Sequence, residues 1–248
     1  MSEGLSDSIS LSAFLAVPRG ALPDPAREVC ALGPSYTTSI HSLPLRPLQG
    51  FTRKLKNYLL RWTSMPNPNI TSYDHFTEED RAHITIVSNT LYRHKTLQLK
   101  YTTYDMLEGL DKVYQRRRPD VMVLSDDEDH PYMYGRVLDF FHVNVTNNSP
   151  NALPLDGEAP MVQMAWVRWF KLDKHLPSGF TSLRYPSVSF YECHDTDAFG
   201  FIHPDEIIRA VHLIPSFRSG KTMEYLSVPS KARPETEDQD WKHFKVNV

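Results

Sequence analysis

Histidine and cysteine side chains that could ligate a metal lie close together in one short segment of the chain. Cys193, His194 and His203 are of the types that bind zinc, and His142 and His212 are candidates to join them in space. In a β-rich domain, such side chains more often lie in the interior or at the rim than on a metal. The chain has only 2 cysteines, too few for a four-cysteine zinc site or a disulfide framework. We therefore expect no metal site.

Carboxylates gather in the same segment. Those that could hold two metal ions for a nuclease are Asp195, Asp197, Asp205 and Glu206. Two-metal enzymes draw their carboxylates from separated elements, whereas these four lie in a single loop. A second acidic run, at 126–129, has consecutive side chains that diverge and repel, which is typical of a solvated loop. We expect neither group to be catalytic.

Other catalytic and cofactor-binding signatures are missing from the sequence. The 10 glycines are scattered, and neither GxGxxG nor GxxxxGK[ST] occurs. The sequence also lacks GxSxG, HExxH and CxxC. No apolar run approaches the ~18 residues that a membrane-spanning helix needs. We expect a non-enzymatic protein with no cofactor and no membrane contact.

Two basic clusters are candidates for nucleic-acid binding. The first lies on the polar face of an amphipathic helix expected at 48–63, whose apolar stripe is spaced by three and four residues, and the second precedes Pro119. The candidate residues are Arg53, Lys54, Lys56, Arg61, Arg116, Arg117 and Arg118. The alternative interpretation is that the helix docks on its own domain with a solvated basic face. The second cluster would then lie in an exposed loop. Residues 95–215 carry 12 basic and 17 acidic side chains, which disfavours duplex binding by the domain as a whole.

Aromatic side chains are frequent between residues 132 and 191. Most of them must be buried, because each removes a large apolar area from water. A subset could line an aromatic cage for a methylated lysine. The spacing does not select which residues would form it.

The elements that would position these side chains change in character along the chain. Residues 1–47 are rich in Pro, Ser and Gly and are expected to form a disordered leader. Residues 48–94 are expected to be helical, with a second helix at 78–91 whose later half could instead be a strand, because it is β-branched. From residue 97 the hydrophobic period changes to two, which predicts strands near 97–101, 121–123, 134–145, 161–170, 188–193, 198–201 and 207–214. Residues 229–248 are expected to be a polar tail with a strand-like run at its end.

Short strands with little helix between them predict a mostly β (α+β) fold, with one domain at 95–228. We expect a small, partly open β barrel with the two N-terminal helices packed outside it. The side chains expected in its core are Leu99, Val137, Phe141, Val143, Val167, Trp169, Val211 and Ile214.

Several segments carry a family resemblance. The chain resembles a domain of uncharacterised, transposon-associated proteins of mushroom-forming fungi in the segments LKYTTYD (99–105), RPDVMVLS (118–125), PYMYGRVLDFFHVNV (131–145), VRWF (167–170) and AFGFIHPDEIIRAVHLIPSF (198–217). The run WKHFKVNV (241–248) is similar to the segment that follows that domain. A weaker similarity links the order of these segments to plant transposon-associated domains whose β core is compared with bromo-adjacent-homology modules.

The resemblance implies an accessory role, because such domains stand beside or downstream of a transposase catalytic domain and no activity is assigned to them. It implies no catalytic residue. We expect a recognition module of a transposable-element-derived protein that binds protein or chromatin inside the cell, in the nucleus. The alternative is a nucleic-acid-binding part of a transposition complex that acts through the basic segments. The sequence sets no oligomeric state.

Overall fold

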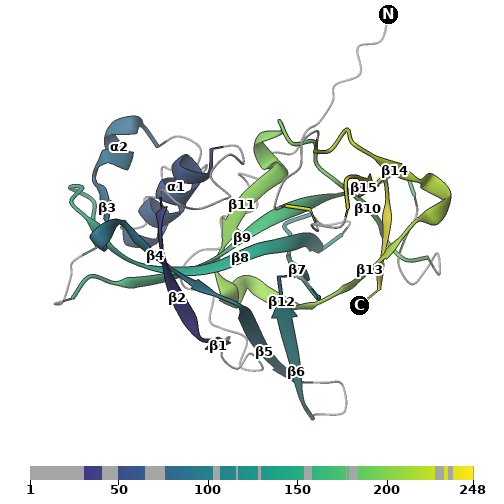
Figure 1. The fold of residues 1–248 in the computed structure, drawn as a ribbon, viewed down its shortest axis with the longest axis horizontal. Coiled ribbons are helices and arrows are strands. Elements are labelled where there is room, and N and C mark those ends of the chain that lie inside the picture. The colour runs from purple at the N-terminus through teal and green to yellow at the C-terminus, as the bar shows by residue number, and fades with distance from the viewer. Residues whose placement is uncertain are drawn as a thin grey trace, which may run out of the picture.

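A computed structural model of the chain shows a mostly β protein (Figure 1). The structure describes residues 31–40, 50–64, 76–102, 107–115, 117–127, 130–153, 158–176, 178, 184–226, 232–233 and 237–247. Within these ranges, no helix is long and apolar enough to cross a membrane. The helices are α1 (Phe51–Thr63) and α2 (Glu78–Ala82). The strands are β1 (Ala31–Leu32), β2 (Ser35–Ser39), β3 (Ile84–Ile86), β4 (Thr90–His94), β5 (Thr96–Thr102), β6 (Glu108–Tyr114), β7 (Asp120–Leu124), β8 (Tyr132–Asn147), β9 (Met161–Leu172), β10 (Ser187–Phe190), β11 (Phe199–Ile202), β12 (Ile207–Ala210), β13 (His212–Pro215), β14 (Lys221–Thr222), β15 (Asp240–Trp241) and β16 (Phe244–Asn247).

The two longest strands, β8 and β9, form the backbone of an 11-stranded sheet. Its main path runs β12-β7-β8-β9-β10-β16-β13, while β3 and β4 also pair with β8, and β11 pairs with β9. The sheet is not closed into a barrel. The strands at the two ends of this path, β12 and β13, are successive segments joined through Val211 rather than partners of each other. The expected mostly β class is confirmed. The sheet is open, and the expectation of a partly open barrel stays a prediction.

Helix α1 covers one face of the long strands because its apolar stripe needs a partner surface. Phe51, Leu55 and Leu59 are buried. The Phe51 ring lies 5.1 Å from that of Trp166 on β9 and 6.2 Å from that of Phe141 on β8, both in edge-on geometry. The opposite face of the same strands contributes Val137, Val167 and Trp169 to a second cluster, together with side chains of β5 and β6. Side chains thus fill both faces of β8 and β9, as the unbroken apolar run of β9 predicts.

The third apolar cluster lies where the sheet curls at its C-terminal end. It contains the rings of Phe170, Phe190 and Phe244 and the side chains of Val188 and Val246. The Phe170 and Phe190 rings stack with centroids 4.2 Å apart, and Phe244 meets both edge-on. This cluster brings β16 against β10 and β13.

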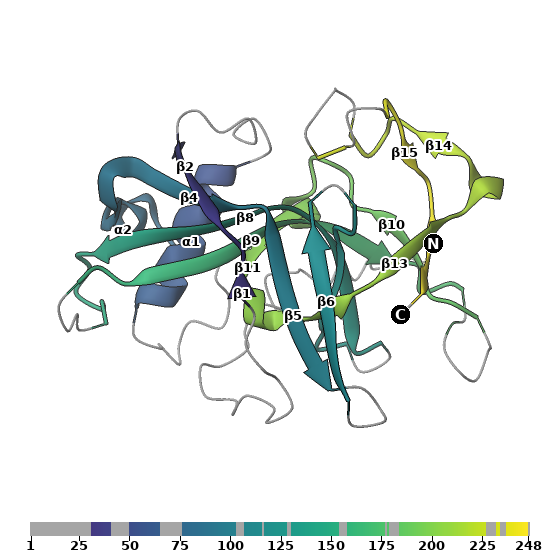
Figure 2. The ribbon, with the colours of Figure 1, turned by 60° about the horizontal axis from the view of Figure 1, so that its bottom comes forward.

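Strands β5 and β6 form a separate three-stranded sheet with the short β1. Figures 1 and 2 show the two strands side by side, extending away from the long sheet. Residues 97–101 were expected to form a strand, and β5 confirms it. Strand β6 was not expected, because Gly109, Asp111 and Lys112 interrupt its apolar pattern. Gly109 is needed there, because a Cβ at this position would lie 2.5 Å from Cζ of Tyr101.

Several boundaries differ from the expected ones. The disordered leader is wrong for residues 31–40, because β1 and β2 pair by backbone hydrogen bonds with β5 and β4, which needs no apolar period. Residues 1–30 and 41–47 lie outside the described residues. Helix α2 ends at Ala82, since the β-branched residues 84–86 form β3 against β8.

Strand pairing divides the expected strand at 207–214 into β12 and β13. It places Ile214 on the outer face with 37% of its surface exposed, so the expected burial of Ile214 is wrong. The other seven expected core side chains are buried.

Candidate recognition surface

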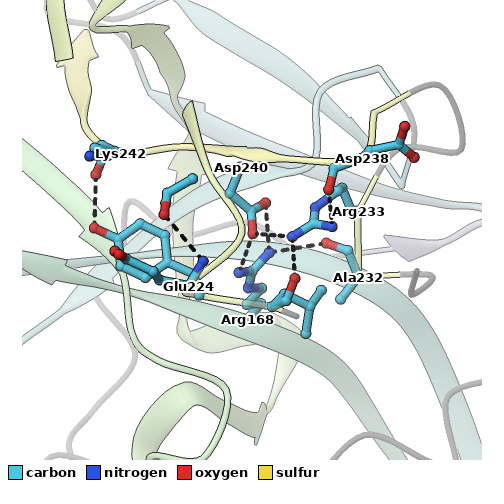
Figure 3. Close-up of polar contacts among 10 residues, drawn as sticks. Arg168, Glu224, Ala232, Arg233, Asp238, Asp240 and Lys242 are labelled. Carbon is cyan, nitrogen blue, oxygen red and sulfur yellow. Dashed lines mark hydrogen bonds and ion pairs between the residues drawn. The ribbon is translucent and has the colours of Figure 1, made fainter. Parts of the chain in front are cut away.

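A buried ion-pair network ties the C-terminal segment to the centre of the long sheet (Figure 3). Arg168, on β9, is only 1% exposed and donates two hydrogen bonds to Asp240, from Nη1 to Oδ1 at 3.1 Å and from Nη2 to Oδ2 at 2.9 Å. Arg233 donates a third, from Nη2 to Oδ2 of Asp240 at 2.9 Å. One carboxylate therefore serves two buried guanidinium groups.

Backbone carbonyls accept further hydrogen bonds from the two arginines. Arg233 donates to the carbonyls of Leu226 and Asp238 at 2.7 and 2.6 Å, and Arg168 approaches that of Ala232 at 3.4 Å. The Arg168 guanidinium also lies 3.6 Å above the Phe190 ring, which supplies a cation–π contact on its flat face. A guanidinium group suits this position because its planar, fixed array of N–H donors can bind both oxygens of a carboxylate and nearby backbone carbonyls at the same time.

The network favours the ionised form of its carboxylate. Burial of Asp240 raises the pKa of its carboxyl, but the hydrogen bonds from Arg168 and Arg233 outweigh this effect, so the pKa lies below its ordinary value. Burial in turn lowers the pKa of Arg168. The pair is charged at neutral pH, because an arginine with two carboxylate contacts keeps its proton.

The residue that follows this buried carboxylate reaches the surface. Asp240 is 4% exposed, whereas Trp241 is only half-buried, because successive strand residues point to opposite sides. Phe217 lies against Trp241 with ring centroids 5.2 Å apart and planes at 82°, and Phe217 itself is 74% exposed. On strand β14, Lys221 pairs with Trp241 and holds its Nζ 4.8 Å from the centroid of the Trp241 ring. We call Phe217, Lys221 and Trp241 the aromatic corner.

A second, half-buried arginine lies directly opposite the first. Arg136 on β8 pairs in register with Arg168 on β9. It forms a two-point contact with Asp120, at 2.7 and 2.9 Å. Burial lowers the pKa of Arg136, but the attraction of Asp120 outweighs it, so the pKa lies above its ordinary value. The two arginines are therefore each held by a carboxylate of their own, and both serve the fold.

A further polar cluster lies where β4 meets β8. Asp139 follows a bulge in β8, is fully buried, and forms an ion pair with Arg93 and a 2.5 Å hydrogen bond with Gln115 Nε2. Burial raises the pKa of Asp139 to about 6. Beside it, the rings of His94 and His142 share a 2.7 Å hydrogen bond between Nε2 and Nδ1. Burial, with a smaller effect of His94, lowers the pKa of His142.

The basic residues of the expected helix do not form one free basic face. Lys54 donates to the carbonyls of Thr196 and Phe199, and Lys56 donates to that of Arg81. Arg53 is exposed and Arg61 is half-buried. This supports, for the two lysines, the interpretation of a helix docked on its own domain.

The second basic cluster lies elsewhere in the molecule. Arg117 and Arg118 are exposed between β6 and β7, and Arg116 lies outside the described residues. Figure 1 shows this turn on a different part of the molecule from α1, so the two basic clusters do not form one surface.

The metal candidates do not converge. Within the described parts of the chain, no group of three or more His, Cys, Asp or Glu side chains could hold a metal ion. Instead, several of these side chains make local contacts. The Asp195 carboxylate accepts a hydrogen bond from the backbone N–H of Asp197, and the Glu206 carboxylate accepts one from the backbone N–H of His203. The centroid of the His203 ring lies 4.5 Å from that of the Trp62 ring. In the acidic run at 126–129, Asp127 pairs with Lys174, and residues 128–129 lie outside the described residues.

Sequence reasoning missed the aromatic corner and the network beneath it. Arg168 is a charged residue in an otherwise apolar run, and this pattern is a signal of a buried ion pair. Asp240 and Arg233 gave no such signal, because they lie in a polar stretch. Comparison of the chain with protein-family models, curated proteins and solved structures found no match.

Proposed function

We propose that this protein is a non-enzymatic recognition module that binds a basic segment of another protein, such as a histone tail, through the aromatic corner. The observation that carries the proposal is the pair Phe217 and Trp241, a mostly exposed ring set perpendicular to a half-buried one. Exposed aromatic side chains on a rigid base are typical anchors of protein interfaces.

The chemistry of the corner favours a basic partner. The Trp241 ring face accepts the ammonium group of Lys221, which shows that this face suits a cation, and a lysine of a partner would take this position by displacing Lys221. The buried network beneath the corner supports the proposal, since it fixes Asp240 and with it the strand that presents Trp241.

A structural role for three buried carboxylates supports the non-enzymatic part of the proposal. Asp240, Asp120 and Asp139 each face an arginine at close range. Arrangements of this kind stabilise a fold without requiring a substrate. The bromo-adjacent-homology-like core, the origin from a transposable element and the nuclear location remain part of the proposal on the strength of the sequence resemblance.

An array of overlapping core-histone peptides, unmodified and lysine-methylated, tests the proposal on the full chain. We expect the wild-type protein to bind at least one basic peptide and Phe217→Ala to weaken that binding by roughly 30-fold, which corresponds to a hot-spot loss of about 2 kcal/mol. The matched control is Leu176→Ala, which removes another exposed apolar side chain. No binding to any peptide, or equal binding by Phe217→Ala, would contradict the proposal.

A further inference from the structure

The side chain of Lys221 lies against the Trp241 ring because the two residues are cross-strand partners. Strands β14 and β15 pair Lys221 with Trp241 and Thr222 with Asp240. Side chains of directly opposite residues in an antiparallel pair share one face of the sheet. The Lys221 Nζ lies 4.8 Å from the centroid of the ring, within the distance of about 6 Å at which a ring face attracts an ammonium group.

Backbone hydrogen bonds fix this pair of strands on both sides of the contact. Gly220, which precedes Lys221, has a φ of 73°, a conformation that favours glycine. Its carbonyl accepts a hydrogen bond from Lys242 N at 3.0 Å. The hydroxyl of Tyr225 donates to the carbonyl of Lys242 at 3.2 Å. The approach of Lys221 to the ring is therefore set by the backbone.

The Trp241 ring is the partner of the Lys221 ammonium group. Among the described residues, no carboxylate forms an ion pair with Lys221. The nearest carboxylate along the pair of strands, that of Asp240, is buried and binds Arg168 and Arg233 instead. The free protein thus fills a cation-binding ring face with a cation of its own.

We propose that Lys221 is an internal occupant of the aromatic corner and lowers the affinity of the corner for cations from outside. A ring face that holds one ammonium group must release it before it can accept another. A cation–π contact at an exposed site corresponds to a roughly two- to fivefold effect on affinity. A partner side chain can also reach the Phe217 ring, which is 74% exposed, and this second contact favours the replacement of Lys221. The role of Lys221 toward a protein partner rests on the proposed function.

Titration of the full chain with tetramethylammonium chloride, at a total salt concentration held constant with sodium chloride, tests the inference without a peptide. The readout is the NMR signal of the Trp241 indole N–H, assigned by its loss in Trp241→Phe. Lys221→Gln removes the ammonium group and keeps a side chain of similar length. It should lower the dissociation constant for tetramethylammonium by about two- to fivefold. Lys221 is exposed, so circular dichroism should show an unchanged fold.

The matched control is Lys242→Gln, which removes the same charge from the residue next to Trp241. Lys242 is exposed, and the hydrogen bonds given above involve only its backbone. The control should keep the wild-type dissociation constant, whereas Lys221→Arg should raise it, because a guanidinium group stacks well on an aromatic face. An equal gain in Lys221→Gln and Lys242→Gln would assign the effect to charge alone and overturn the inference. An unchanged constant in Lys221→Gln, or no response of the Trp241 signal in any of these proteins, would overturn it too.

The histone-peptide array separates this inference from the proposed function. Lys221→Gln should bind the same peptide as the wild type, about two- to fivefold more tightly. Peptide binding that Phe217→Ala weakens and Lys221→Gln leaves unchanged would support the proposed function and contradict the role of Lys221 toward the partner. If no peptide binds, the proposed function fails, and the tetramethylammonium titration still decides whether Lys221 occupies the ring.

Discussion

Replacing Asp240 by asparagine should destabilise the protein strongly. The carboxylate is 4% exposed and accepts three hydrogen bonds from Arg168 and Arg233. Asparagine keeps one oxygen, but its amide group turns a donor toward the two guanidinium groups, and the negative charge that compensates them is lost. Breaking a buried ion pair by removing one partner costs about 3–5 kcal/mol, because the remaining charge stays buried without compensation. In a chain of this size, this loss lowers the melting temperature by on the order of 10 °C.

Thermal unfolding followed by circular dichroism measures this effect. Asp238→Asn is the matched control, because Asp238 is exposed and Arg233 contacts only its backbone carbonyl. The control should change stability by less than about 0.5 kcal/mol. The pKa of Asp240 is lowered in the folded state, so its stabilising effect is complete above the ordinary value of 3.8 and is lost as the pH falls further. Asp240→Asn should lack this acid-dependent loss. A melting temperature within 2 °C or so of wild type would refute the argument that the network holds the C-terminal segment.

Other predictions concern the packing and the titration of named side chains. Phe190→Ala should cost about 3–5 kcal/mol in chemical denaturation, because the ring is buried beneath Arg168, and a cost below about 1 kcal/mol would contradict its place in the core. Gly109→Ala should speed amide exchange throughout β5 and β6, since the new Cβ must displace the Tyr101 ring; unchanged exchange would show that the ring moves freely. The pKa of Asp139 rises from 3.8 to about 6 on folding, so the wild-type stability should fall as the pH rises through this window. Asp139→Asn should remove that slope, and an equal slope in both proteins would assign it to other groups.

The strongest hydrophobic patterns predicted their elements well. Strands β8 and β9 follow from alternating or continuous apolar runs, and α1 follows from apolar residues spaced by three and four. Strands β1, β2 and β6 escaped prediction because backbone pairing with an existing neighbour forms them, and their side chains are mostly polar or exposed. Whether the sheet closes on itself could not be predicted, because local periodicity does not fix which strands meet at the end of a sheet.

The candidate sites show a similar division. Arg117 and Arg118 were correctly placed in an exposed segment, but their separation from the basic residues of α1 depends on how the strands assemble. Phe217 and Trp241 are far apart in sequence, and only the pairing of β14 with β15 brings them together. Residue types alone could therefore name aromatic and basic candidates without grouping them into surfaces.

Hydrogen exchange of the full chain, measured with and without the basic histone peptide that binds most tightly on the array, tests the central claim most directly. We predict that peptide binding slows exchange in residues 217–223 and 240–242, the segments that form and support the aromatic corner. Slower exchange confined to other segments, with these two unchanged, would contradict the claim that the aromatic corner is the recognition surface.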